Sequence, residues 1–112
     1  MAPMFAWQRV RVRGPSMSPT LRDGDSVLVC HGRSPRPGDV VLATFRSMPA
    51  RPVLKRVLRR EADGWWLASD NVAAGGASES HGTADVVAVV LLRWRPGSVL
   101  PRRVRQRSRS EA

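Results

Sequence analysis

The chain is poor in several residue types, and each shortage excludes a class of structure. Its single cysteine, Cys30, rules out an intramolecular disulfide, so the redox compartment cannot be inferred from bridges. No apolar run approaches the roughly 20 residues that a membrane-spanning helix needs. The apolar N-terminal run ends at Trp7, which is too short for the core of a signal peptide, and Arg9 follows. We therefore expect a soluble, cytoplasmic protein.

Histidine is also scarce, with His31 and His81 as its only examples. His31 lies next to the end of an expected strand and His81 in an expected loop, so a triad of the Ser-His-Asp type is disfavoured. The neighbouring Cys30 and His31 have no second pair of ligands and match no usual metal site. We expect neither a metal nor a cofactor.

Acidic residues are outnumbered by 19 Lys and Arg to 9 Asp and Glu, which gives a formal net charge of +10. Such an excess fits a nucleic acid, an acidic membrane surface or an acidic substrate. The basic residues are scattered along the chain, so we interpret most of them as a solvated surface. Aromatic residues are only 5% of the chain, too few for a base-stacking surface. A nonenzymatic nucleic-acid binder stays an alternative, but we expect no nucleic-acid partner.

Lysine is rare as well, because Lys55 is the only lysine among the 19 Lys and Arg residues. It lies in the apolar run 53–57, where strand alternation places it on the same face as Val53 and Val57. The same alternation directs Arg56 to the other face, toward solvent or substrate. Arginine stays protonated in proteins, whereas a buried lysine can lose its proton and act as a base. The sequence therefore predicts that Lys55 is a general base.

A serine in a rigid turn is the natural partner for such a base. Ser16 lies in the run Gly14-Pro15-Ser16-Met17-Ser18-Pro19-Thr20-Leu21, between two apolar, strand-like segments. Proline fixes the backbone angle φ, so Pro15 and Pro19 make the turn rigid on both sides. A serine hydroxyl becomes a good nucleophile only when a neighbouring base takes its proton. These features favour a Ser16/Lys55 catalytic dyad.

The order of the motifs resembles the signal peptidase I clan of Ser/Lys peptidases, which also holds the LexA/UmuD-type self-cleaving proteins. Residues 16–21 look like the nucleophile box, residues 36–41 like the Gly-Asp strand box, and residues 53–57 like the general-base box. Residues 69–71, Ser-Asp-Asn, look like the late Gly-Asp-Asn box, with Ser69 in place of the usual glycine.

Within this clan the chain is most similar to the short nickel-type superoxide dismutase maturation proteases. The similarity lies in Gly64-Trp65-Trp66, in residues 70–76 and in the run 91–96. It implies a serine endopeptidase that removes the N-terminal extension of a nickel superoxide dismutase precursor. The alternative is a signal peptidase I-like enzyme that cleaves signal peptides while lying at the inner face of the membrane. In that case the basic tail would make a weak contact with acidic lipids.

The resemblance also implies which groups assist the dyad. The backbone N–H of Ser16 is the expected oxyanion donor. Some family members add a serine hydroxyl two positions earlier, where this chain has Gly14. The family serine that hydrogen-bonds the lysine, and an acidic residue after it, fall here on Gly75 and Ala77. This leaves Ser78, which falls on a retained family serine, as the expected partner of the base.

The remaining site residues follow from the same resemblance. An extended substrate segment is expected to add as a strand beside the nucleophile and the base. Asp70 and Asn71 are expected to fix their loop rather than to react. The residues expected to line the substrate cleft are Met17, Pro19, Val53 and Leu54.

Period-two patterns predict a mainly β protein with little helix. The resemblance implies a small peptidase fold of the signal peptidase and LexA type, with twisted antiparallel strands. We expect an N-terminal arm over residues 1–8, a peptidase domain over 9–96 and a basic, disordered tail over 97–112. The expected strands are residues 9–13, 26–30, 40–45, 53–60, 65–68 and 86–94.

Overall fold

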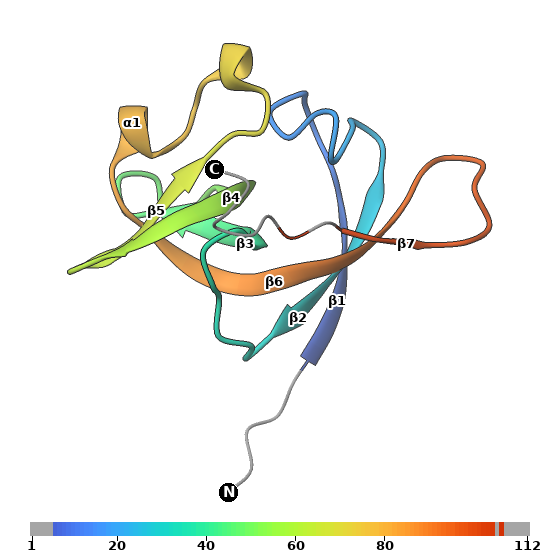
Figure 1. Cartoon of the computed structure of the whole chain (residues 1–112), viewed down its shortest axis with the longest axis horizontal. Helices are drawn as coiled ribbons and strands as arrows, with labels where there is room; N and C mark the ends of the chain where they lie inside the picture. Colours follow the sequence, from blue (N-terminus) through green and yellow to red (C-terminus); the bar gives the residue numbers. More distant parts are fainter. Residues whose placement is uncertain (1–5, 105, 107–112) are drawn as a thin grey trace, which may run out of the picture.

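The computed structural model describes residues 6–104 and residue 106. Its strands form one antiparallel sheet in the order β1-β2-β6-β3-β4-β5, with β7 paired to β6 (Figure 1). This arrangement confirms the expected small, mainly β fold of antiparallel strands with little helix. The strands are β1 (Ala6–Arg11), β2 (Ser26–His31), β3 (Val40–Phe45), β4 (Pro52–Glu61), β5 (Gly64–Ala68), β6 (Ala84–Trp94) and β7 (Arg102–Arg103).

Strand β6 lies at the centre of the sheet. It separates the β1–β2 pair from the β3–β4–β5 group, and it pairs with both β2 and β3. Strand β5 also reaches back to β6 through the pair Trp65 and Ala84, so this half of the sheet curls onto itself. Gly64 permits the approach, because a Cβ there would lie 2.7 Å from the Ala84 carbonyl oxygen. The curled sheet thus encloses apolar side chains on both of its faces.

Strand β3 shows how the core divides between those faces. Val40 and Leu42 belong to one buried cluster, which also holds Met17 and Leu21. Val41 and Phe45 belong to a second cluster on the opposite face. A strand that is buried on both faces reads as a continuous apolar run, as residues 40–45 do in the sequence.

The segment between β5 and β6, expected as a loop, contains a short 3-10 turn (Val72–Ala74) and one turn of α-helix, α1 (Ser78–His81). In Figure 1 it stands on the same side of the sheet as the turn that follows β1. Within the described residues, no helix has the length and apolar character needed to cross a bilayer.

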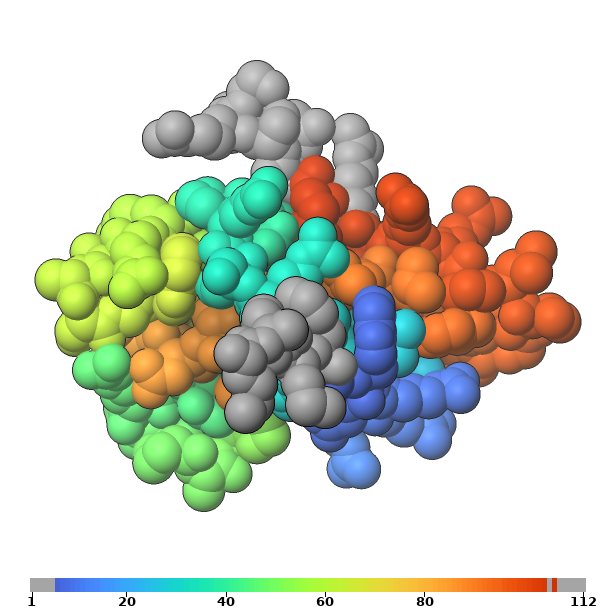
Figure 2. Space-filling model, turned by 90° about the horizontal axis from the view of Figure 1, so that it is seen from below, coloured from blue at the N-terminus to red at the C-terminus, as the bar shows by residue number. Residues whose placement is uncertain are grey.

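Both ends of the expected domain are extended by strand structure. Strand β1 begins at Ala6, inside the expected N-terminal arm. The expected disordered tail contains β7, and the Val104 N–H donates to the Leu91 carbonyl at 2.8 Å. Val104 is ordered because its side chain, 5% exposed, completes the first core cluster. In Figure 2 the segment around β7 (orange-red) and the β4–β5 hairpin (yellow-green) form opposite ends of the molecule. The rest of both predictions, residues 1–5, 105 and 107–112, lies outside the described residues.

Candidate active site

The turn that carries Ser16 is closed at its base by backbone hydrogen bonds. The Val12 N–H donates to the Asp25 carbonyl at 2.8 Å, and the Gly24 N–H donates to the Val12 carbonyl at 2.9 Å. Inside the turn, Met17 and Leu21 are fully buried in the first core cluster. These anchors hold the turn on the sheet and leave Ser16 partly exposed between them.

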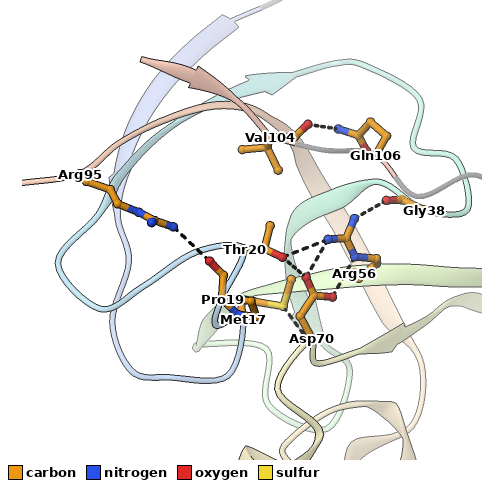
Figure 3. A network of polar contacts seen from close by, with 9 residues as sticks. All are labelled: Met17, Pro19, Thr20, Gly38, Arg56, Asp70, Arg95, Val104 and Gln106. Carbon is orange, nitrogen blue, oxygen red and sulfur yellow. Dashed lines mark hydrogen bonds and ion pairs between the residues drawn. The ribbon is translucent and has the colours of Figure 1, made fainter. Parts of the chain in front are cut away.

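The late box, Asp70-Asn71, holds the Ser16 turn from the other side. The Asn71 N–H donates to the Ser16 carbonyl at 2.9 Å, and the Asn71 side-chain amide donates to the Pro15 carbonyl at 3.1 Å. The Asp70 N–H lies 3.4 Å from the Met17 sulfur (Figure 3). The contacts of Asp70 and Asn71 are thus structural, and they fix the peptide plane of Ser16.

Arg56 is buried in a polar network rather than directed to solvent or substrate (Figure 3). It is 4% exposed, and its Nε and Nη2 lie 2.8 and 2.7 Å from the two carboxylate oxygens of Asp70. Its Nη1 donates to the Gly38 carbonyl at 2.7 Å, and the Thr20 hydroxyl donates to Asp70. The expectation that Arg56 faces outward was wrong, because both faces of β4 are covered at this point. Its cross-strand neighbour, Val40, lies in the first core cluster.

Lys55 lies on the opposite face of β4, beside the second core cluster. It pairs across the ladder with the buried Val41, and the residue is only 5% exposed. Burial lowers the pKa of the Lys55 amine below its ordinary value of 10.5, because the charged form loses solvation. The negative charge of Glu79, on α1, partly opposes this change and raises the pKa. The net direction favours the neutral amine that a general base requires.

Ser16 and Lys55 line the same cleft, which has a volume of about 630 Å³. Met17, Val53 and Leu54, all expected to line the cleft, are also in its wall. Pro19 is not among the residues that line it. Its carbonyl instead accepts a hydrogen bond from Arg95 Nη2 at 3.0 Å, because the turn places Pro19 beside the first residue after β6 (Figure 3).

Two strand edges without a sheet partner border this cleft. Within the described residues, β1 pairs only with β2, and residues 10–13, the end of β1 and the two residues after it, line the cleft. Residues 52–55 of β4 pair with β3 on one side, while β5 pairs only from Arg56 onward. Open edges of this kind offer backbone hydrogen-bonding groups to an added strand. The cleft therefore has the form of a site for an extended peptide.

The sequence profile described as peptidase S24-like matches residues 7–90, which include Ser16, Lys55 and the late box. The chain belongs to the peptidase S24-like family. This assignment supports a serine peptidase of the LexA and signal peptidase type. A search among curated proteins finds no match.

In this S24-like peptidase the hydroxyl beside the lysine comes from Ser69. Lys55 Nζ donates to Ser69 Oγ at 3.1 Å, and Ser69 Oγ donates to the Gly75 carbonyl at 2.9 Å. A carbonyl can only accept, so the single hydroxyl hydrogen of Ser69 is used there. Ser69 therefore accepts from the amine and leaves the nitrogen lone pair of a neutral lysine available.

Ser78, expected to be the partner of the lysine, makes a different contact. It is buried at the start of α1, and its Oγ accepts a hydrogen bond from the Leu67 N–H at 2.8 Å. The sequence did carry a signal for the actual arrangement. Ser69 occupies the usual glycine position of the late box, and Gly75 occupies the usual serine position. The hydroxyl that the family has at position 75 is therefore present in this chain at position 69.

Proposed function

We propose that the protein is a serine endopeptidase with Ser16 as nucleophile and Lys55 as general base. Neutral Lys55 takes the hydroxyl proton while Ser16 Oγ attacks a peptide carbonyl and forms a tetrahedral intermediate. The protonated Lys55 gives this proton to the leaving amine as the peptide C–N bond breaks, which leaves an acyl-enzyme and a neutral lysine. Lys55 then activates the water that releases the product. The observation that carries the proposal is the position of the chain's only lysine, buried in the wall of the cleft that Ser16 lines.

The backbone of Ser16 is held in place, whereas its hydroxyl makes no hydrogen bond to Lys55 among the described residues. Catalytic hydrogen bonds often tighten only when substrate binds. The Ser16 N–H is the proposed oxyanion donor, and Asn71 fixes the carbonyl of the same residue. A serine in place of Gly14, which could supply a second donor, would have a strained backbone, because the φ angle there is +81°.

The proposed substrate is a precursor protein whose extended N-terminal segment binds between the two open strand edges. By its motifs the chain resembles nickel-type superoxide dismutase maturation proteases, so we propose the nickel superoxide dismutase precursor, with cleavage in the cytoplasm. The N-terminal extension of a precursor can reach a cleft of this size because it need not be folded.

The direct test is a processing assay with purified precursor. We expect the wild-type protein to shorten the precursor at one position, and the Ser16→Ala variant to leave it intact. Mass spectrometry of the product identifies the cut. A precursor that stays whole while an unrelated active protease cuts it would exclude this substrate. Equal cleavage by the Ser16→Ala variant would exclude Ser16 as the nucleophile.

The lowered pKa of Lys55 predicts the pH dependence of this activity. Because the neutral amine is the active form, kcat/KM should rise with pH along an acid limb whose pKa lies below 10.5. Glu79→Gln removes the charge that raises the pKa of Lys55, so its acid limb should move to lower pH. Glu61→Gln is the matched control, because Glu61 pairs with Arg59 on the β4–β5 hairpin. If the Glu79→Gln and Glu61→Gln profiles coincide, the limb does not report Lys55.

A further inference from the structure

We infer that the cleft selects acidic peptide segments, an inference that rests on the proposed peptidase function and names its substrate class. The wall of the cleft carries the guanidinium groups of Arg11, Arg13 and Arg51, and no Asp or Glu is among the described residues that line it. The chain as a whole has 9 acidic residues beside its 19 Lys and Arg, whereas the described lining of this cleft has none. A substrate with carboxylates near the cut meets an attractive field on entry.

The arginines stand on both borders of the cleft. Arg11 is the last residue of β1 and Arg13 follows it by two residues, and Arg51 directly precedes the open part of β4. An extended segment that adds to either strand edge therefore has a guanidinium beside it. Because side chains alternate along a strand, carboxylates at alternate positions of the substrate can reach these groups without leaving the ladder.

None of the ion pairs among the described residues neutralises these arginines. Arg11, Arg13 and Arg51 are exposed, and the ion pairs within the described part of the chain involve other arginines. Asp23, the acid nearest in sequence to Arg11 and Arg13, lies outside the cleft wall. Its carboxylate accepts a hydrogen bond from the Gly14 N–H at 2.8 Å. Glu79 acts electrostatically on Lys55 and is likewise not in the wall. We call these three arginines the rim of the cleft, and their positive charge is available to a ligand.

The size of the effect follows from the exposure of the rim. An ion pair between exposed groups changes binding by about two- to fivefold, and dissolved salt weakens it. Three such arginines are enough to rank substrates, although they are too weak to bind one alone. We therefore expect preference rather than absolute selection, with a clear dependence on ionic strength.

The test uses three versions of one peptide that spans the precursor's cut. Two residues near the cut are Glu in the first version, Gln in the second and Lys in the third. We expect kcat/KM to fall in the order Glu, Gln, Lys, by about two- to fivefold for each charge, and the spread to shrink at high salt. Equal rates for the three peptides at low salt would overturn the inference while leaving the peptidase function in place.

Arginine variants assign the preference to the rim. Arg51→Gln and Arg13→Gln should each reduce the preference for the Glu peptide over the Gln peptide, and Arg51→Glu should favour the Lys peptide. The matched control is Arg36→Gln, which removes one exposed charge from the loop between β2 and β3, outside the cleft. If Arg36→Gln reduces the preference as much as Arg51→Gln does, the preference comes from total charge and the rim is not its source.

A binding arm separates this inference from the proposed function. Fluorescence anisotropy of the labelled Glu, Gln and Lys peptides with the Ser16→Ala variant requires no catalysis. Tighter binding of the Glu peptide supports a cleft that prefers acidic segments, even if the wild-type protein cleaves no peptide. Binding that does not distinguish the three peptides at low salt overturns it.

Discussion

Replacement of Lys55 by arginine is expected to lower kcat/KM by about 10²- to 10⁴-fold, the usual contribution of a general base. The substitution keeps a positive charge at the same place on β4, but a guanidinium does not release its proton at any ordinary pH. Raising the pH should therefore not restore activity to the variant. The measurement is the rate of precursor cleavage across the pH range for both proteins.

The same position offers a variant that separates catalysis from folding. Lys55→Met removes the amine but keeps an unbranched apolar chain in the buried site. It should be as inactive as Lys55→Arg, yet more stable than the wild type at neutral pH, by about 0.5–2 kcal/mol. The sign follows from the lowered pKa. Between that pKa and 10.5 the unfolded chain binds more protons than the folded one, so wild-type stability rises with pH. Turnover within tenfold of the wild type in either variant would show that Lys55 is not the base.

Removal of Arg56 is expected to be the most destabilising change in the polar network. Arg56→Met takes the guanidinium from Asp70, whose side chain is 2% exposed. Breaking a buried ion pair from one side costs about 3–5 kcal/mol, because the remaining charge stays desolvated. A domain of this kind has a total stability of only about 5–15 kcal/mol. Denaturant unfolding of the variant should show a midpoint far below that of the wild type.

An exposed ion pair provides the control for this loss. Arg46 pairs with Asp85 at 3.2 Å, but both side chains are more than half exposed. Arg46→Met should therefore change the free energy of unfolding by about 0–1 kcal/mol. If Arg56→Met costs no more than Arg46→Met, the network around Asp70 does not stabilise the fold as the geometry indicates.

Strands β2 to β6 could be predicted closely from the sequence because their apolar patterns are local, whereas β1 lies at residues 6–11 instead of 9–13 and β7 was not expected. Residues 40–45 coincide with β3, and the expected strand 53–60 differs from β4 by a single residue at each end. The prediction for residues 65–68 misses only Gly64, which pairs with Glu61 at the hairpin turn. In each case the two bounding turns were visible as Gly, Pro or acidic residues, so the limits were close.

The contacts that join distant segments could not be predicted in this way. Alternation along β4 correctly placed Lys55 on an apolar face, but it assumed that the face of Arg56 meets solvent or substrate. Whether that face is covered depends on how the sheet curls, and no pattern within β4 records the curl. The contact between Ser69 and Lys55 has the same origin, since it requires the loop after β5 to lie over β4. Val104 was assigned to a disordered tail because its arginine-rich neighbours hide one well-buried apolar side chain.

The central position of β6 has a consequence for the newborn protein. Ser16 belongs to the β1–β2 pair and Lys55 to the β3–β4–β5 group, and in sheet order β6 is the strand between them. During synthesis both residues leave the ribosome before β6 does, so a nascent chain carries Ser16 and Lys55 on separate hairpins. The sheet that brings Ser16 and Lys55 to one cleft is therefore complete only after β6 has been synthesised.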